Sequence, residues 1–333
     1  MTFKAPFKLS VSVACIAVAA PVLTLILIRQ YCSRFRWGKC RSKASMKGKT
    51  VIITGANSGL GKVTASELAK RGARVICACR DLTSGRRAIE EIRKYVKSGD
   101  LVLQHLDLAS FSSIHAFSQE VLSCEPRIDV LINNAGVYSP PYSLTENGFE
   151  MQLGINHVGH FLLTNLLLPK LQLGPSRIII VASSLYKYGN IYLEFLKKPE
   201  SYAFNRKKGY SDSKLANVLF SRELMKNVQN YDVDVYSVCP GMVWTKLGRH
   251  SKIPWWKMIL LAPFAFLFVR RPIEGCQTIL HCAIDEKVKP APDHIFKDCK
   301  AIPMDIKALD DKLCKELWDI TSDLTKLNKK DFD

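Results

Sequence analysis

The first 66 residues of this 333-residue chain contain no aspartate or glutamate, because the first acidic residue is Glu67. Residues 1–50 hold ten of the 48 lysines and arginines, so the rest of the chain carries 38 basic and 30 acidic residues. More than half of the formal net charge of +18 therefore belongs to a short N-terminal stretch. A nucleic-acid-binding protein would instead spread its basic residues over a folded face. The distribution argues against a nucleic-acid partner and favours a membrane surface.

Cysteine pairs at metal-binding spacing are also lacking. The eleven cysteines are an odd number scattered along the chain, which suits reduced thiols in a cytosolic domain better than a disulfide framework. His157 and His160 have a spacing compatible with a metal, but no third ligand accompanies them, so we predict no metal site. Repeats, low-complexity tracts and linkers are lacking after residue 50, which indicates one domain.

A long uncharged run lies beside the basic residues. Leu9–Ile28 contains twenty residues without a formal charge, and a helix of that length covers about 30 Å, the thickness of a bilayer core. Eight basic residues follow within residues 29–49 and two precede the run, so the domain after it is expected in the cytosol. A cleaved signal peptide is the alternative, although its apolar core would be unusually long. We expect a tail at 1–8, a transmembrane anchor at 9–28 and a basic juxtamembrane segment at 29–49.

Beyond the basic segment, short apolar runs alternate with longer amphipathic stretches. Helices are predicted over residues 60–70, over 84–97 and after a cap at Ser110. This alternation is typical of a parallel sheet covered by helices on both faces. We predict an α/β, doubly wound parallel sheet in a single domain over residues 50–327, with strands at Thr50–Thr54, Arg74–Ala78, Leu101–Leu106, Val130–Asn133, Ile178–Val181 and Val233–Val238.

One apolar stretch departs from this pattern. Ile253–Val269 contains five aromatic residues and two prolines, with Lys257 as its single charge. Its seventeen residues are few for a membrane span. Two interpretations stay open: a buried core helix, or a mobile lid over an apolar substrate pocket that dips into the membrane.

The first predicted strand leads directly into a glycine-rich turn with the spacing G-x-x-x-G-x-G. Glycines let phosphate groups approach the backbone at a helix N-terminus. Strand, turn and helix follow one another here as such a motif requires. The turn predicts a Rossmann-like, dinucleotide-binding fold with contacts from Gly55, Asn57, Ser58, Gly59, Leu60 and Gly61.

The end of the second strand bears on which dinucleotide binds. An acidic residue there accepts the ribose hydroxyls and selects NAD. In this chain Cys79 takes that place and Arg80 follows it, and a guanidinium suits a 2′-phosphate. We predict NADP(H) rather than NAD(H). The alternative is a solvated Arg80 beside an Asp81 that caps the next helix.

Three further motifs follow in order: Asn133-Asn134-Ala135-Gly136 after the fourth strand, Ser183 at the end of the fifth, and Tyr210-Ser211-Asp212-Ser213-Lys214 at the start of a long helix. With the glycine turn, they resemble the short-chain dehydrogenase/reductase family over about residues 47–325. The stretches Asn156–Phe161 and Leu185–Gly189, together with the basic-flanked anchor, look most similar to the retinol dehydrogenase group of types 11 to 14.

Four residues match the catalytic positions of that family. Tyr210 and Lys214 are four apart and share a helical face, so the ammonium can lower the pKa of a phenol that is too weakly acidic at neutral pH. Ser183 corresponds to the serine that hydrogen-bonds the substrate oxygen, and the neighbouring Ser184 would point the other way. Asn156 corresponds to the residue that holds a water on the proton path to Lys214. The alternative is a purely structural role, as a buried Asn that is hydrogen-bonded to neighbouring backbone.

The resemblance also implies cofactor contacts beyond the glycine turn. Besides Arg80, Tyr210 and Lys214, these are Asp107 and Leu108 at the adenine, Asn134, Ala135 and Gly136 beneath the cofactor, and Pro240, Gly241, Val243 and Thr245 at the nicotinamide.

The resemblance implies an oxidoreductase that uses NADP(H) to interconvert retinal and retinol, with reduction favoured. The anchor and the aromatic stretch favour an apolar substrate from membrane lipid, in the endoplasmic reticulum or else a mitochondrial membrane. Reduction of other lipid-derived aldehydes or sterol ketones stays open, as does a non-catalytic scaffold, which would predict a decayed site. Whether the chain is a monomer or a homo-oligomer is not decided by the sequence.

Overall fold

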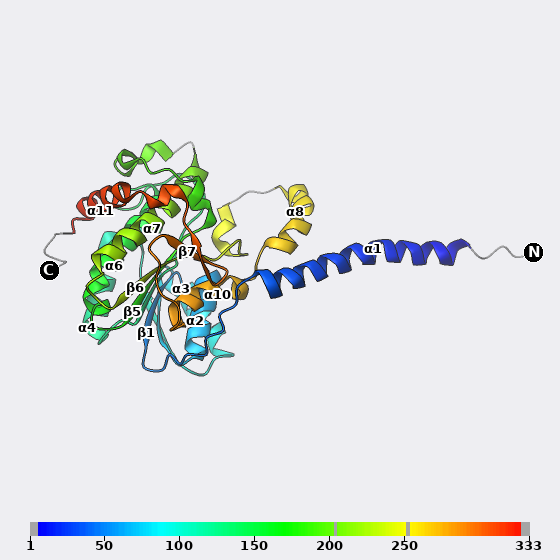
Figure 1. Ribbon diagram of the computed structural model, residues 1–333, viewed down its shortest axis with the longest axis horizontal. Helices are drawn as coiled ribbons and strands as arrows, with labels where there is room; N and C mark the ends of the chain where they lie inside the picture. Colours follow the sequence, from blue (N-terminus) through cyan, green and yellow to red (C-terminus); the bar gives the residue numbers. More distant parts are fainter. Residues whose placement is uncertain (1–5, 203–204, 251–253, 328–333) are drawn as a thin grey trace, which may run out of the picture.

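The computed structural model describes residues 6–202, 205–250 and 254–327, with the side chains of residues 6–18, 195, 206, 250, 255 and 259 outside the description. Its centre is an eight-stranded sheet in the order β3-β2-β1-β4-β5-β6-β7-β8 (Figure 1). The strands are β1 (Thr50–Thr54), β2 (Arg74–Cys79), β3 (Asp100–His105), β4 (Val130–Asn133), β5 (Ser176–Val181), β6 (Val233–Cys239), β7 (His294–Lys297) and β8 (Lys300–Pro303).

The predicted doubly wound parallel sheet is confirmed from β1 to β7, where every neighbouring pair of strands is parallel. The prediction was incomplete at one edge. β8 pairs with β7 in the antiparallel direction, through a turn in which Asp298 and Cys299 have positive φ. The sequence argument missed both β7 and β8, because each has only four residues and lacks the continuous apolar run that identified β1 to β6.

Helices cover both faces of the sheet (Figure 1). Successive residues of a strand point to opposite faces, so Val51 and Ile53 enter the core under one helix layer while Ile52 enters the other core. The first layer contains α2 (Gly59–Lys70), α3 (Leu82–Arg93) and α10 (Gln277–Ile284). The second layer contains α4 (Phe111–Cys124), α6 (Gly159–Leu171) and α7 (Arg206–Asn227).

Side-chain caps set several helix starts. Ser110 accepts a hydrogen bond from the Ser113 amide, which confirms the predicted cap of α4. The predicted start of α3 was two residues late, because Asp81 caps that helix. The long helix α7 begins four residues before Tyr210, since Asn205 caps it by accepting from the Lys208 amide. Tyr210 therefore lies inside α7 rather than at its start.

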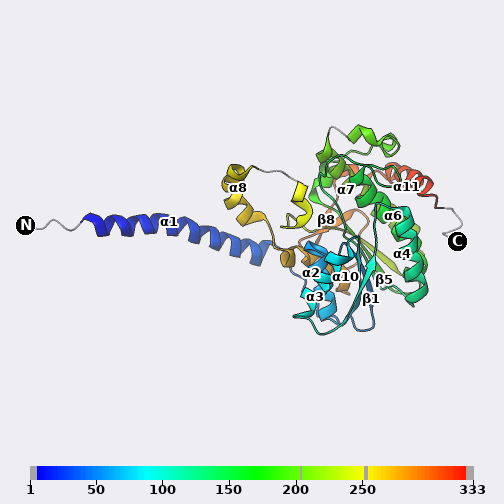
Figure 2. The ribbon, with the colours of Figure 1, turned by 180° about the vertical axis from the view of Figure 1, so that it is seen from behind.

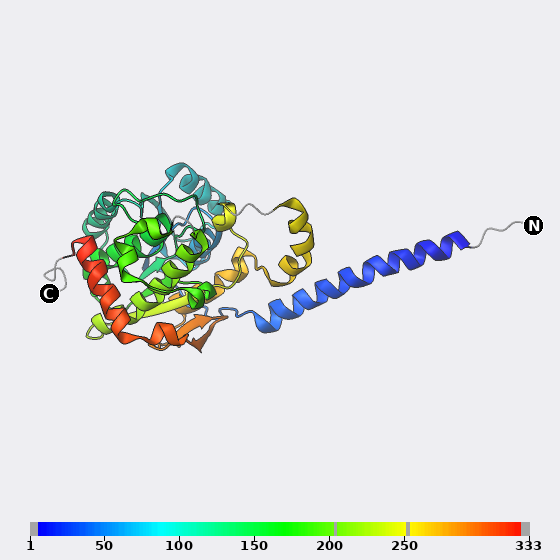
Figure 3. The ribbon, with the colours of Figure 1, turned by 90° about the horizontal axis from the view of Figure 1, so that it is seen from above.

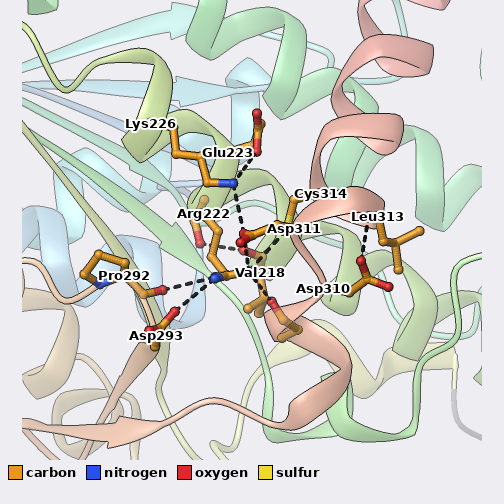
Figure 4. Close-up of polar contacts among 12 residues, drawn as sticks. Val218, Arg222, Glu223, Lys226, Pro292, Asp293, Asp310, Asp311, Leu313 and Cys314 are labelled. Atoms are coloured by element: carbon orange, nitrogen blue, oxygen red, sulfur yellow. Dashed lines mark hydrogen bonds and ion pairs between the residues drawn. The ribbon is translucent and has the colours of Figure 1, made fainter.

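A buried arginine joins α7 to the C-terminal helix α11 (Asp311–Thr325) (Figure 4). Arg222 pairs with Asp293 at 2.9 Å and with Asp311 at 3.2 Å, and it donates to the Ala308 carbonyl at 3.1 Å. Lys226, one turn further along α7, also pairs with Asp311 at 2.9 Å. These bonds hold the C-terminal helix against the helix that carries Tyr210.

The N-terminal helix α1 (Pro6–Tyr31) extends away from the sheet as a long rod, and α8 (Trp255–Phe268) lies on the same side of the domain (Figures 1, 2 and 3). Over the residues and side chains that the structure describes, no helix is both long and apolar enough to cross a bilayer. The tail residues 1–5 and Ile253 lie outside the described residues. Leu260 and Phe264 of α8 are 72% and 51% exposed, so the buried-helix interpretation of this stretch was wrong.

Candidate active site

The glycine turn lies at the carboxyl end of β1. Gly55 and Gly59 have φ of +67° and +54°, a conformation that glycine adopts without strain. A Cβ on Gly61 would overlap the Gly55 carbonyl oxygen. Ser58 makes no side-chain bond to the first turn of α2, whereas side chains cap α3 and α4. The amides at the start of α2 are therefore available to an anionic ligand.

A cleft of about 430 Å³ opens beside this turn, a size typical of small-molecule sites. Twelve of the predicted cofactor residues line it: Gly55, Asn57, Ser58, Gly59, Leu60, Arg80, Asp107, Leu108, Asn134, Ala135, Gly136 and Thr245. The predicted contacts outside its lining are Gly61, Tyr210, Lys214, Pro240, Gly241 and Val243. The Lys214 ammonium lies 3.8 Å from the point that a Cβ on Gly136 would occupy.

Arg80 and Asp81 have separate positions at the end of β2. Asp81 caps α3 by accepting from the amides of Thr83 and Ser84 at 2.9 and 3.3 Å. Hydrogen bonds from Ser84 hold the pKa of the Asp81 carboxyl below its usual value. The predicted cap by Asp81 is confirmed. Arg80 is exposed, and its side chain borders the cleft rather than taking part in the cap.

The loop after β6 closes against the glycine turn. The Thr245 Cγ2 atom lies 3.0 Å from the point that a Cβ on Gly59 would occupy. Lys246 and Arg249 follow Thr245 and also line the cleft. The sequence argument missed these two basic residues, although their position directly after Thr245 could have indicated them.

Arg270 holds this loop in place and was also missed. Its side chain is 8% exposed, pairs with Asp298 at 2.6 Å and donates to the Pro240 carbonyl at 3.4 Å. Its backbone accepts from the Trp244 amide and donates to the Met242 carbonyl, both at 2.8 Å. Because these partners are 26 to 30 residues away or on the β7–β8 turn, no local motif marks Arg270.

Tyr210 and Ser183 meet at the end of β5. Tyr210 is 5% exposed. Burial raises the pKa of its phenol, and the neighbouring Ser183 hydroxyl, which also accepts from the Leu185 amide at 3.3 Å, acts against that rise. The Tyr138 ring packs edge-on against Tyr210 with the ring centres 4.8 Å apart. Ser184 instead lowers the pKa of the buried Cys239 thiol, against the larger rise that burial causes, so the two serines act on different neighbours.

Lys214 is buried one helical turn beyond Tyr210. Its ammonium donates to the Val181 carbonyl at 2.8 Å and lies 5.7 Å from the centre of the Tyr210 ring. Burial lowers the pKa of Lys214 to about 8. A Cβ on Gly136 would lie 3.8 Å from this ammonium and 3.1 Å from Asn156 Oδ1, so the small glycine keeps a space open between the lysine and the cleft.

Asn156 lies in a π-helical turn (Gly154–Val158) between α5 (Met151–Leu153) and α6. Such turns are frequent at functional sites. Its side chain accepts from the Val137 amide at 2.8 Å, and donates to the Val137 carbonyl at 3.1 Å and to Ser213 Oγ at 2.9 Å. Asn156 thus joins the segment after β4 to α7, which agrees with its interpretation as a buried residue tied to backbone.

The buried His160 supports this arrangement. His160 contacts Thr54 Oγ1 at 2.9 Å and the Asn156 carbonyl at 3.0 Å, and Thr54 Oγ1 accepts from the amides of Asn134 and Ala135. The histidine therefore connects β1, the segment after β4 and the π-helical turn.

We expect the free energy of unfolding to fall as the pH is lowered below about 6.5. Burial lowers the pKa of His157 to about 4 and that of His160 to about 3. Below pH 6.5 these histidines are protonated in the unfolded chain but stay neutral in the folded chain. Each histidine therefore lowers the free energy of unfolding by about 1.4 kcal/mol per pH unit. Denaturation of the purified protein between pH 7.5 and 5 measures this slope. The dependence of the unfolding free energy on pH should flatten in a His157→Asn/His160→Asn variant. It should persist in His115→Asn, which replaces an exposed histidine. An equal slope in the unsubstituted chain and both variants would show that His157 and His160 do not cause the dependence.

The fold and this site define the class of protein. The short chain dehydrogenase family matches residues 49–195, and the chain belongs to the short-chain dehydrogenase/reductase family of oxidoreductases, whose members use a nicotinamide cofactor. Retinol dehydrogenase 14 of Mus musculus is 48% identical over 83% of this chain and 85% of its own length. Retinol dehydrogenase 12 of Homo sapiens is 44% identical over 87% and 90%.

A solved structure extends the likeness to three dimensions. The crystal structure of an uncharacterised protein from Mycobacterium paratuberculosis superposes with a TM-score of 0.68 at 33% identity, and covers 87% of this chain and 98% of its own. The predicted resemblance to the retinol dehydrogenase group is confirmed by the sequence identity to retinol dehydrogenases 14, 12 and 11 over most of the chain.

Proposed function

We propose that this chain is a membrane-anchored, NADP(H)-dependent retinal reductase that also oxidises retinol. The observation that carries the proposal is the convergence of Tyr210, Ser183, Lys214 and Asn156 near the cleft that the glycine turn lines. All four side chains are intact, and three of them are buried. A non-catalytic scaffold would have no need of this convergence.

The residues present fit a nicotinamide dinucleotide. The amides at the start of α2 would bind the pyrophosphate, Arg80 would pair with the 2′-phosphate, and Asp107 would lie at the adenine end. The open space at Gly136 leads toward the Lys214 ammonium, which would donate to the nicotinamide ribose. When bound, the reduced cofactor supplies the hydride for the carbonyl carbon.

The chain itself supplies the proton and the orientation. Tyr210 Oη would donate its proton to the substrate oxygen, and Ser183 Oγ would hydrogen-bond the same oxygen. Burial excludes bulk water from the phenol, so the proton must return through groups of the chain. The Lys214 ammonium, held at the Val181 carbonyl, would favour the phenolate that forms. Asn156 would keep the Gly136–Val137 backbone in register beside that path.

The substrate and the membrane are argued from similarity and sequence. Relatives named retinol dehydrogenases cover most of the chain, which supports a retinoid. The uncharged run Leu9–Ile28 lies within the continuous helix α1 and precedes eight basic residues, which supports a single-pass anchor with the domain in the cytosol. The endoplasmic reticulum is the membrane that we propose.

Turnover by membranes that contain the full chain tests this function. We expect all-trans-retinal to be reduced to retinol faster with NADPH than with NADH, and not by membranes that contain Tyr210→Phe. Retinol formation that is independent of Tyr210 would contradict the mechanism. If NADPH binds without turnover of retinal, other lipid aldehydes and sterol ketones become the substrates to assay.

A further inference from the structure

The segment between α1 and β1 is packed on the domain. A Cβ on Gly38 would overlap the Asp298 carbonyl, so the two backbones are in close contact. The Cys40 amide donates to Gln277 Oε1 at 3.1 Å, and Met46 is 6% exposed within the core under α2 and α10. Residues 37–46, which we call the strap, therefore fix the point at which α1 leaves the domain.

The end of α1 is bonded to the end of α8. Arg29 donates to the Val269 carbonyl at 3.2 Å and to the Phe266 carbonyl. Its guanidinium also lies 5.4 Å from the centre of the Trp37 ring, and Arg270 lies 5.1 Å from the same ring. Cation–π contacts of this kind stabilise the joint. The strap, α1 and α8 are thus held together rather than linked by a loose chain.

The surface of α8 is apolar and exposed. The helix has one charged residue, Lys257. Single exposed apolar residues are ordinary on a soluble protein, but a contiguous set marks a contact surface. The exposed apolar residues on and beside this helix are Trp244, Trp256, Met258, Leu260, Leu261, Phe264, Phe266 and Phe268, each at least 42% exposed.

The apolar surface continues onto α1. Leu23 and Leu27 of α1 are 57% and 55% exposed, and both helices lie on the same side of the domain (Figure 3). A groove of about 690 Å³ separates them, lined by apolar side chains such as Ile26 and by Arg29 and Arg271. The two helices flank an open, largely apolar space, and at its foot Glu274 pairs with both Arg29 and Arg271.

We propose that α8 lies in the cytosolic leaflet of the bilayer that holds α1, parallel to the membrane plane. This inference rests on the proposed membrane anchor. Fourteen residues cover about 21 Å, too little to span a core of about 30 Å, so the helix would lie with Leu260 and Phe264 among the acyl chains. Arg34 and Arg36 would meet anionic headgroups. The bilayer is the occupant because the strap brings α8 to the place where α1 enters the membrane.

This position bears on substrate entry. Thr245, Lys246 and Arg249 line the cleft, and Arg249 precedes the first residue of α8 by only six positions in the chain. Arg270, directly after α8, holds the Pro240 carbonyl. A helix embedded in the leaflet therefore connects at both ends to the segment that borders the cofactor cleft, and an apolar carbonyl compound would reach the site from the membrane.

Photo-crosslinking of the full chain in vesicles of phosphatidylcholine and phosphatidylserine tests the proposal. A benzophenone side chain placed at Leu260 is expected to form lipid adducts, detected by mass spectrometry. The matched control is a benzophenone at Ile306, which is 83% exposed on the 3₁₀ turn Ile306–Leu309 and is expected to form none. Adducts from position 260 to a second copy of the chain, or no lipid adduct, would overturn the proposal.

A kinetic comparison tests the consequence for entry. A Leu260→Glu/Phe264→Glu variant is expected to raise KM for all-trans-retinal in vesicles about fivefold. In this variant, NADPH binding and turnover of a water-soluble short-chain aldehyde should be unchanged. In the control Ile306→Glu, KM for retinal, NADPH binding and turnover of the soluble aldehyde should all be unchanged. An unchanged KM for retinal would refute membrane entry at α8. Crosslinking needs no turnover, so it tests the position of α8 even if retinal is not a substrate.

Discussion

Replacement of Tyr210 by phenylalanine is expected to lower kcat about 10²- to 10⁴-fold, the range of a lost general acid. The substitution removes only the phenolic hydroxyl and keeps the ring that packs against Tyr138. The fold and the cleft should therefore stay intact. Pre-steady-state reduction of retinal measures the chemical step, and titration with NADPH, followed by cofactor fluorescence, should give a Kd within about twofold of the unsubstituted chain.

Tyr138→Phe is the matched control for this prediction. Tyr138 is the neighbouring tyrosine, in edge-on ring contact with Tyr210, and its variant also loses one hydroxyl. We expect it to keep most of the activity. If Tyr138→Phe were inactive and Tyr210→Phe active, the proton donor would be Tyr138, and the arrangement of Ser183 and Lys214 would need another explanation.

Replacement of Arg80 by alanine is expected to raise KM for NADPH by about 10- to 100-fold, because a charge-assisted bidentate hydrogen bond to a phosphate contributes about 1.5–3 kcal/mol. KM for NADH should change less than about threefold, since NADH has no 2′-phosphate. The exposed position of Arg80 in the cleft lining is the structural reason. Steady-state kinetics with each cofactor, at a saturating concentration of carbonyl substrate, measures the change in selectivity.

Arg87→Ala separates a direct contact from a general effect of charge. Arg87 is an exposed residue of α3 that does not line the described cleft, so its loss removes the same charge from the same region. Equal changes for Arg80→Ala and Arg87→Ala would show a long-range field rather than a contact. A selectivity change in Lys246→Ala alone would assign the phosphate to the loop after β6.

The contact between the strap and Arg270 connects the foot of α1 to the loop beside the predicted cofactor cleft. Arg270 contacts the Trp37 ring on one side and the Pro240 carbonyl on the other. Arg29, at the foot of α1, contacts the same ring. If α1 is the membrane anchor that we propose, this joint would orient the domain relative to the bilayer as well as retain it there, as an enzyme with a bilayer-dissolved substrate requires.

Features carried by neighbouring residues followed from the sequence itself. The six strands from β1 to β6 each contain apolar residues that point to both faces of the sheet, so their composition identifies them without knowledge of their partners. Tyr210 and Lys214 are one helical turn apart, and the glycine turn joins a strand to the next helix within a few residues. For these features the local backbone geometry decides which side chains share a face, and local geometry is readable from spacing.

Features that join distant residues were decided only by the tertiary structure. Examples are the ties from Asn156 to Val137 and Ser213, the hold of Arg270 on the loop after β6, and the packing of Gly38 on Asp298. The exposure of α8 belongs here too, because an apolar helix has the same sequence whether protein or lipid covers it. Burial and pairing depend on what the rest of the chain brings alongside, and no periodicity within one segment records that.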